Sequence, residues 1–275
     1  MSFAKMPGGE IDYAPCRYGK SRIAFRGPKK KLEHTYVAFV GGTETYGKFV
    51  PEPFVAQAET DLGVECVNLG CVNAGIDAFL AEPAVLGVTQ HADVTVVQIM
   101  GAQNMSNRYY KVHPRRNDRF IGASQMMQLV FNEVDFSEFH FNRHMLQSLL
   151  ASAPERYAMV REELRMAWSA RMKLLINTIG GKVVLLWMAE HSPDDEAATE
   201  DLGRDPLFIN RAMLDELMPL VEDLVEVVVT PDEAEGSTGE MVFSEMEQVA
   251  ARKMLGPSVH TQTAAAVSHV LRALI

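Results

Sequence analysis

The sequence predicts an α/β protein, in which a doubly wound parallel sheet of five strands carries helices on both faces. Three observations predict it: five short runs are almost continuously apolar, helical patterns separate most of them, and glycine follows each of the first three. Continuous apolar runs are typical of strands that are buried on both faces, as in a parallel sheet. Strands that alternate with helices imply right-handed crossovers, which place helices on both faces.

The expected strands are rich in β-branched and aromatic residues, which suit the pleated, buried surface of a sheet. They are residues 35–40, 64–69, 93–100, 182–188 and 225–229. The expected helices are residues 53–62, 78–89, 135–151, 155–179, 211–224, 244–255 and 261–274. Asp135 with Glu138 matches a capping box, and Pro154 occupies a first helical position. Gly180-Gly181 predicts the end of the long fourth helix.

The chain divides into an N-terminal segment and one large domain. Residues 1–34 are expected to form an extended basic segment, because residues 1–31 hold eight Lys and Arg against Glu10 and Asp12. Residues 35–275 are expected to form a single α/β domain with one large core. The connection between the third and fourth strands is too long for one crossover, which predicts a helical insertion at about residues 105–180.

Composition argues against several classes of protein. The net charge is −10, and the body beyond the basic segment is more acidic still, which argues against a nucleic-acid partner. No apolar run reaches the roughly 20 residues of a membrane span, so no membrane partner is expected. Three cysteines and the absence of an apolar leader favour a cytoplasmic protein. Association with further copies of the chain stays open.

Candidate site residues follow from the positions of the strand ends. In open α/β sheets, ligands bind outside the carboxyl ends of the strands. The residues selected by this rule are Gly42, Thr43, Glu44, Thr45, Gly70, Cys71, Asn73, Gly101, Gln103, Asn104, Asn107, Glu190, His191, Asp232 and Glu233, with His260 at the start of the final helix.

One pattern at the first of these loops is that of a phosphate-binding P-loop. Gly42 to Lys48 matches GxxxxGK. Phe49 stands where that motif has the Ser or Thr that binds magnesium. Pro51 and Pro53 delay the helix whose N-terminus would bind phosphate. Binding of a nucleotide or sulfate donor is therefore the third of three hypotheses.

A second pattern extends over most of the domain in four blocks. They are Val37–Gly47 (VAFVGGTETYG), Val67–Gly70 (VNLG), Gly101–Asn104 (GAQN) and Pro257–His260 (PSVH). In their order and strand positions these blocks resemble the SGNH, or GDSL-like, hydrolases, and the chain is similar to a proteobacterial group of SGNH-like proteins. The resemblance implies a flavodoxin-like three-layer sandwich with strand order 2-1-3-4-5. No cofactor is expected.

The resemblance also implies roles for particular residues. Thr43 stands where the family has its nucleophilic serine, and His260 stands where it has the general base. Gly70, with Gln103 or Asn104, would bind the oxyanion. A Thr nucleophile is hindered by its methyl group and still requires a base.

Three further positions depart from the family pattern, one of them Gln103, which stands where the family has an asparagine unless Asn104 takes that place. Gly42 replaces an aspartate, and Pro257 replaces the aspartate that orients the histidine. Without a carboxylate partner the tautomer of His260 is not fixed, unless Asp232, Glu190 or another acid takes that place.

Three other side chains have structural explanations beside functional ones. Cys71 lies next to Gly70 and is an alternative nucleophile, although a packed thiol is the commoner role. His140 and His144 have the i,i+4 spacing of metal ligands on a helix, but no third ligand is evident. No metal is expected.

The densest cationic stretch of the acidic body is residues 109–119. Its arginine side chains suit a carboxylate, phosphate or sulfate group, and pairing with acids of the body is the alternative. The residues expected to bind substrate are Gly42, Glu44, Asn73, Asn107, Arg115, Arg116 and Arg119. The first hypothesis is a hydrolase or acyltransferase acting on an ester or acyl group of a small, anionic substrate. The second is a non-catalytic small-molecule-binding protein with the same pocket.

Overall fold

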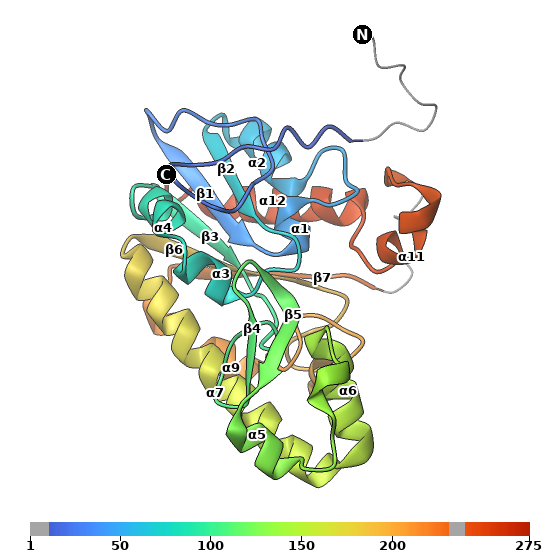
Figure 1. Ribbon diagram of the computed structural model, residues 1–275. Helices are drawn as coiled ribbons and strands as arrows, with labels where there is room; N and C mark the ends of the chain where they lie inside the picture. Colours follow the sequence, from blue (N-terminus) through green and yellow to red (C-terminus); the bar gives the residue numbers. More distant parts are fainter. Residues whose placement is uncertain (1–10, 231–239) are drawn as a thin grey trace.

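A five-stranded parallel sheet forms the centre of the protein (Figure 1). The computed structural model describes residues 11–230 and 240–275. The sheet contains β1 (Tyr36–Gly41), β2 (Glu65–Gly70), β3 (Val94–Gln98), β6 (Lys182–Ala189) and β7 (Asp223–Val228). They lie in the order β2-β1-β3-β6-β7, and every neighbouring pair is parallel. Counted along the chain, these five strands have the order 2-1-3-4-5, so the predicted fold class is confirmed.

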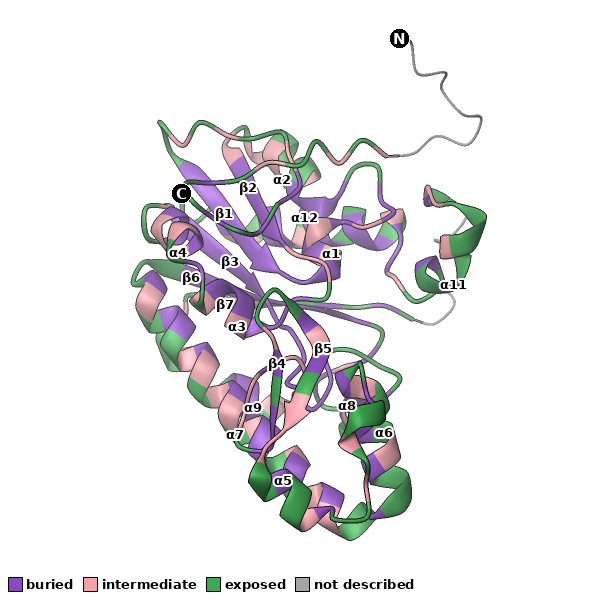
Figure 2. Ribbon diagram, in the orientation of Figure 1, coloured by how far each residue is buried: buried purple, intermediate pink, exposed green. Residues whose placement is uncertain are grey.

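Helices cover both faces of this sheet and complete three layers (Figure 1). One face carries α2 (Phe54–Leu62) and α12 (Pro257–Leu271). The other carries α3 (Ile76–Leu80), α4 (Pro83–Gln90) and α7 (Pro154–Ile179). Successive strand residues point to opposite faces, and in β1 they alternate between two apolar clusters, one for each helical layer. Figure 2 shows β1, β2, β3 and β6 buried along most of their length, whereas β7, at one edge of the sheet, is partly exposed.

The long connection between β3 and β6 is only partly helical, which corrects the prediction of a helical insertion. It begins with an antiparallel hairpin. Its elements are β4 (Tyr110–His113), β5 (Arg116–Ala123), α5 (Gln125–Val130), η1 (Phe136–Glu138), α6 (Asn142–Ser152) and α7. The Asp135 side chain accepts from the Ser137 N–H and caps η1, so the helix expected from residue 135 begins at Asn142 instead.

Short elements lie between the sheet strands elsewhere and after β7. They are α1 (Thr43–Tyr46), α8 (Glu196–Glu200), α9 (Arg211–Asp215), η2 (Met218–Leu220), η4 (Glu245–Glu247) and α11 (Gln248–Ala251). The helix expected over residues 211–224 is shorter than predicted, because Pro219 lies in the 3-10 turn and β7 already begins at Asp223. In the two described ranges, no helix combines the length and the apolar character that a membrane span requires.

The N-terminal segment is docked on the domain from residue 11 onwards. Arg26 is buried, and its guanidinium donates to the carbonyls of Val50 and Pro51 at 2.8 and 2.6 Å. Lys30 forms an ion pair with Glu59 of α2. The basic segment therefore binds the body of its own chain, and residues 22–24 reach the carboxyl edge of the sheet.

Candidate functional site

The loop after β1 is held by an amide at the end of β3. Gln98 is buried, and its Oε1 accepts from the Gly42 N–H at 2.9 Å and from the Thr45 N–H and Oγ1 at 3.2 and 2.6 Å. Its Nε2 donates to Glu44 at 3.1 Å. Burial raises the pKa of Glu44, and the hydrogen bond from Gln98, which favours the charged form, offsets only part of this effect. Sequence reasoning missed Gln98, although an amide inside an apolar strand was the available signal.

A second amide performs the same task on β2. Asn68 Nδ2 donates to the Thr45 carbonyl at 2.7 Å, and Asn68 Oδ1 accepts from the Gly70 N–H at 2.9 Å. The N–H of Gly70, expected to bind an oxyanion, is therefore already occupied. Gly70 has a packing requirement instead, since a Cβ there would lie 2.2 Å from the backbone nitrogen of Tyr46.

Thr43 and Asn73, both predicted site residues, are in contact. The Thr43 hydroxyl accepts from the Asn73 N–H at 3.0 Å and donates to Asn73 Oδ1 at 3.4 Å. Asn73 Nδ2 donates in turn to Asp118 on β5 at 3.2 Å. Burial raises the pKa of Asp118, although the charges of Arg119 and Arg116 lower it. This chain of contacts joins the β1 loop to the hairpin.

His260 lies in the first turn of α12 and is buried against α2. The Phe54 N–H donates to its Nδ1 at 3.1 Å, and the two rings pack with centroids 5.7 Å apart. Burial, with the nearby charge of Arg26, lowers the pKa of His260 to about 3, so the ring is neutral at ordinary pH. Among the described residues, no hydrogen bond joins His260 to Thr43, and the geometry expected for a nucleophile and its base is not formed.

The remaining predicted polar residues bind neighbouring protein groups. Gln103 Nε2 donates to Asp205 at 2.9 Å, and Asn104 Oδ1 accepts from Asn142 at 3.2 Å. Asn107 Oδ1 accepts from the N–H groups of Tyr109 and Tyr110 at 2.8 and 3.1 Å, which shapes the approach to β4. Gln103 and Asn107 therefore stabilise loops in this structure.

A cleft of about 640 Å³ opens beside the β1 loop. Its cationic wall comes from the turn of the β4–β5 hairpin, with Arg115, Arg116 and Arg119, and from Arg22 of the N-terminal segment. The other lining residues are Ile23, Ala24, Tyr46, Cys71, Val72 and His113. Three of the predicted substrate-binding residues are thus brought together at one cleft, and sequence reasoning missed Arg22 and His113.

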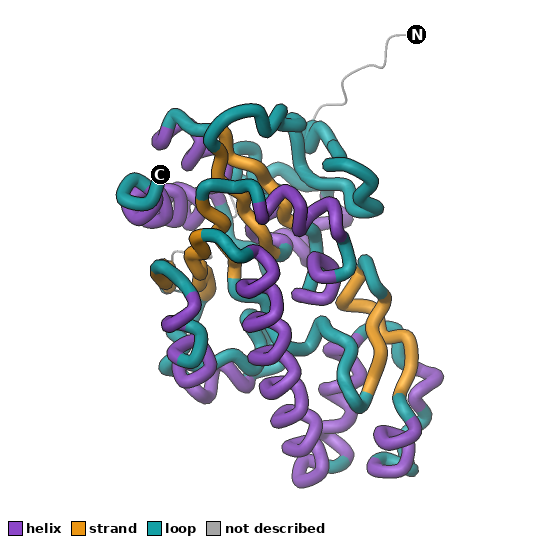
Figure 3. Tube along the Cα trace, turned by 90° about the vertical axis from the view of Figure 1, so that its left-hand side faces the viewer, coloured by secondary structure: helices purple, strands orange, loops and turns teal. Residues whose placement is uncertain are grey.

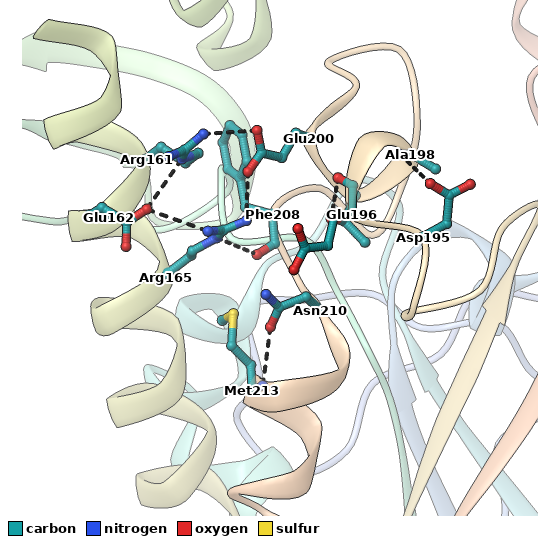
Figure 4. Close-up of polar contacts among 11 residues, drawn as sticks. Arg161, Glu162, Arg165, Asp195, Glu196, Ala198, Glu200, Phe208, Asn210 and Met213 are labelled. Atoms are coloured by element: carbon teal, nitrogen blue, oxygen red, sulfur yellow. Dashed lines mark hydrogen bonds and ion pairs between the residues drawn. The ribbon is translucent and has the colours of Figure 1, made fainter. Parts of the chain in front are cut away.

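Among the residues that the structure describes, three of the four cleft arginines lack the kind of carboxylate partner that arginines of α7 have. On α7, Arg161 and Arg165 are both ion-paired with Glu200 at 2.8 and 3.0 Å (Figure 4). In the described ranges no carboxylate lies within 4.0 Å of the Arg22, Arg115 or Arg116 guanidinium. The hydrogen-bond donors of these three guanidinium groups are therefore not used by a carboxylate of the described residues.

The hairpin turn that carries the arginines is locally ordered. His113 Nδ1 accepts from the backbone N–H groups of Arg115 and Arg116, both at 3.2 Å. Arg119 stacks on Phe141 with 4.1 Å between the guanidinium carbon and the ring centroid, and lies 4.0 Å from Asp118. Backbone hydrogen bonds and stacking thus position the turn, while the guanidinium groups of Arg115 and Arg116 stay exposed.

The alternative sites receive little support from the geometry. Burial, with the charge of Asp118, raises the pKa of the Cys71 thiol to about 11, which disfavours a thiolate nucleophile. Lys48 lies over the ring of Phe49, and the next helix begins only at Phe54, so the helix of a P-loop is not formed at the lysine.

The candidate metal ligands His140 and His144 are not arranged as a metal site requires. His140 precedes α6 and His144 lies on it against Phe139, so the two do not share one helix face. The described part of the chain contains no group of three or more His, Cys, Asp or Glu arranged to hold a metal ion. His191 is buried against Trp187, whereas Glu190 is exposed. Asp232 and Glu233 lie outside the described residues.

The fold and the cleft define a three-layer α/β protein with a cationic cleft at the carboxyl edge of its sheet. The chain belongs to the family described as Domain of unknown function (DUF6473), whose model matches residues 1–275. A search of curated proteins finds no match.

Among solved structures, the fold is similar to hydrolases. One is a lipase/acylhydrolase from Enterococcus faecalis, with a TM-score of 0.46, 10% identity, and coverage of 87% of this chain and 96% of that one. Another is the lipase Lip_vut3 from a goat rumen metagenome, with a TM-score of 0.42, 15% identity, and coverage of 88% and 97%. A third is a carbohydrate esterase family 2 enzyme from Corynascus thermopiles, with a TM-score of 0.44, 11% identity, and coverage of 90% and 68%.

Proposed function

We propose that this protein binds a small anionic molecule in the cleft between the β4–β5 hairpin and the β1 loop. The observation that carries the proposal is the set of exposed guanidinium groups of Arg22, Arg115 and Arg116 on that cleft, which have no carboxylate partner among residues 11–230 and 240–275. In an acidic protein, an arginine ordinarily forms an ion pair with a carboxylate of its own chain, as Arg161 and Arg165 do with Glu200. Arginine forks match the oxygen geometry of carboxylate and phosphate groups.

The cleft also has room and apolar surface for an organic ligand. Its volume of about 640 Å³ falls within the range of pockets for small molecules. Tyr46, Ile23 and Val72 provide apolar surface beside the arginines. We therefore expect a ligand with an anionic group, held by the arginines, and a small organic part that rests on these side chains.

Calorimetric titration at low ionic strength tests the proposal, with inorganic phosphate, sulfate and malonate as probes. Saturable binding of at least one probe, weakened by added salt, is the expected result, because charge-assisted contacts at an exposed cleft are screened. The absence of heat with all three anions at millimolar concentration would overturn the proposal.

A second candidate function is hydrolysis or acyl transfer by Thr43 in the manner of the SGNH hydrolases. The observation that favours it is the place of Thr43 directly after β1, at the edge where this architecture binds ligands. In that candidate His260 would be the base, and the cleft arginines would orient the substrate. Binding is the better supported function, because His260 and the Gly70 N–H are both occupied by the protein itself.

Turnover of short acyl esters distinguishes the two candidates. We expect no hydrolysis above the uncatalysed rate, because among the described residues no His, Asp or Glu side chain hydrogen-bonds to the Thr43 hydroxyl, and the Thr43→Ser variant should be equally inactive. Thr43→Ala should also leave anion binding measurable, since the arginines of the cleft are unchanged.

The opposite pattern would favour the enzyme. Turnover that is abolished in Thr43→Ala, kept or raised in Thr43→Ser, and reduced on the order of 10²–10⁴-fold in His260→Ala would establish acyl chemistry at Thr43. Activity that survives in Thr43→Ala and is lost in Cys71→Ala would place the nucleophile on the neighbouring loop instead.

A further inference from the structure

Arg22 is presented to the cleft from a fixed point of the N-terminal segment. Its backbone N–H donates to the carboxylate of Glu82, a buried residue directly before α4, at 3.1 Å. Its neighbours Ser21 and Ile23 are buried, and the Ile23 N–H donates to Ser21 Oγ at 3.0 Å. The backbone is thus held on both sides of Arg22, whose own side chain is exposed.

The arginines of the hairpin are anchored separately. The β4–β5 hairpin is a two-stranded sheet of its own, and Figure 3 shows it apart from the five-stranded one. Asn117, fully buried next to Arg116, donates from Nδ2 to the His113 carbonyl at 2.9 Å, and its Oδ1 accepts from the Gly75 N–H at 2.8 Å. The turn that carries Arg115 and Arg116 is therefore attached to the loop after β2.

The loops after β1 and β2 separate these two sides of the cleft. Tyr46, on the first loop, packs against Tyr13 of the N-terminal segment with ring centroids 5.3 Å apart. Asn73, on the second, donates to Asp118 of the hairpin at 3.2 Å. Tyr46 and Val72 also line the cleft, so side chains with apolar surface lie between the N-terminal side and the hairpin side.

The lining residues carry more positive charge than one carboxylate of a ligand balances. They include four arginines and no acidic residue. Arg119 has Asp118 4.0 Å away, and the other three have no carboxylate that close within residues 11–230 and 240–275. Like charges repel, and a ligand with one negative charge leaves most of this repulsion in place. The charge therefore favours a ligand with at least two negative charges, and the separation of the two sides favours two anionic groups.

We infer that the ligand of this cleft is a small molecule with two anionic groups, one bound by Arg115 and Arg116 and the other by Arg22. A short apolar body joins the two groups and rests on Tyr46 and Val72. Dicarboxylates and phosphorylated carboxylic acids have this chemistry, and both match the donor geometry of guanidinium groups. The inference rests on the proposed function, because it concerns the same cleft.

Two matched pairs of ligands test it by calorimetric titration of the full chain. The pairs are succinate with succinamate, and 3-phosphonopropionate with 3-phosphonopropionamide; in each, a neutral amide replaces one carboxylate at nearly the same size. Physiological ionic strength, where the Debye length is about 8 Å, limits the effect of distant charges. In at least one pair the compound with two anionic groups should bind at least about tenfold more tightly than its amide, because the amide loses the charge-assisted contact.

Arg22→Ala should abolish this preference, so that the ratio of the two affinities falls to about one. Alanine keeps the backbone N–H that Glu82 accepts, so the segment should stay docked, and thermal unfolding verifies that the variant is folded. Arg17→Ala is the matched control, since Arg17 is an exposed arginine of the same segment that does not line the cleft. It should keep the wild-type ratio.

The outcomes separate this inference from the proposed function. Binding of phosphate, sulfate or malonate, with no preference for two anionic groups in either pair, would leave anion binding in place and overturn the inference alone. A preference that persists in Arg22→Ala, or that is lost equally in Arg17→Ala, would overturn the assignment of the second group to Arg22. A cleft that binds none of these anions would overturn the proposed function and the inference together.

Discussion

Replacing Arg115 and Arg116 together by alanine should weaken anion binding on the order of 100-fold, because each charge-assisted hydrogen bond contributes about 1.5–3 kcal/mol. The expected change in unfolding temperature is small, since both guanidinium groups are exposed and have no ion pair within the described ranges. Their removal also relieves repulsion among like charges. Titration of the variant with the best of the three anion probes measures the loss directly.

Three controls make this result specific. Arg252→Ala removes an exposed arginine of the C-terminal region that does not line the cleft, and it should leave affinity unchanged. Arg116→Lys keeps the charge but loses the planar fork, so its affinity should fall between those of wild type and the alanine variant. Arg22→Ala tests the N-terminal wall of the cleft independently of the hairpin. A double variant that binds as tightly as wild type would remove the cleft from the proposed function.

The second large effect concerns stability, since Gln98→Leu should lower the free energy of unfolding by about 3–5 kcal/mol. Leucine fits the volume but leaves the N–H groups of Gly42 and Thr45 without their acceptor inside the protein. Each buried donor left unsatisfied costs about 1–3 kcal/mol. Urea unfolding followed by circular dichroism gives the measurement.

Gln90→Leu is the matched control for this substitution. Gln90 is exposed and makes a single hydrogen bond, to the Thr178 carbonyl at 2.9 Å, so the same chemical change should cost well under about 1 kcal/mol there. Equal losses at both positions would mean that the amide of Gln98 does not hold the β1 loop.

The sheet was predictable from sequence because its signal is local. Each strand is an apolar run followed by a turn residue, and burial on both faces requires that composition whatever the rest of the chain does. The hairpin at Tyr110–Ala123 was not predicted, since its strands are short, polar and irregular, with shifts of register at Lys111 and Val112. Alternation of apolar and polar residues is too weak a signal in such strands.

The site was predictable only in its position. The rule that ligands bind at the carboxyl ends of strands selected the loops that contribute Tyr46, Cys71 and Val72 to the cleft, but it does not say whether a polar side chain there faces a ligand or another part of the protein. Gly70 and Gln103 both turned out to be engaged by neighbouring groups, and those contacts depend on residues far away in the sequence, such as Asp205. The contribution of Arg22 depends on where the N-terminal segment docks, which no local pattern encodes.

The docking of that segment gives the cleft an unusual thermodynamic dependence. One wall comes from the hairpin and the β1 and β2 loops, whereas Arg22, Ile23 and Ala24 belong to a segment held by the buried side chains of Tyr18 and Phe25 and by the Arg26 hydrogen bonds to the carbonyls of Gly47, Val50 and Pro51. The apparent affinity is then the intrinsic affinity multiplied by the fraction of molecules in which the segment is docked. A ligand that bridges both walls in turn stabilises the docked state, by a free energy that increases with the concentration of ligand. A change that weakens the Arg26 hydrogen bonds would therefore lower the affinity for the ligand, although Arg26 does not line the cleft.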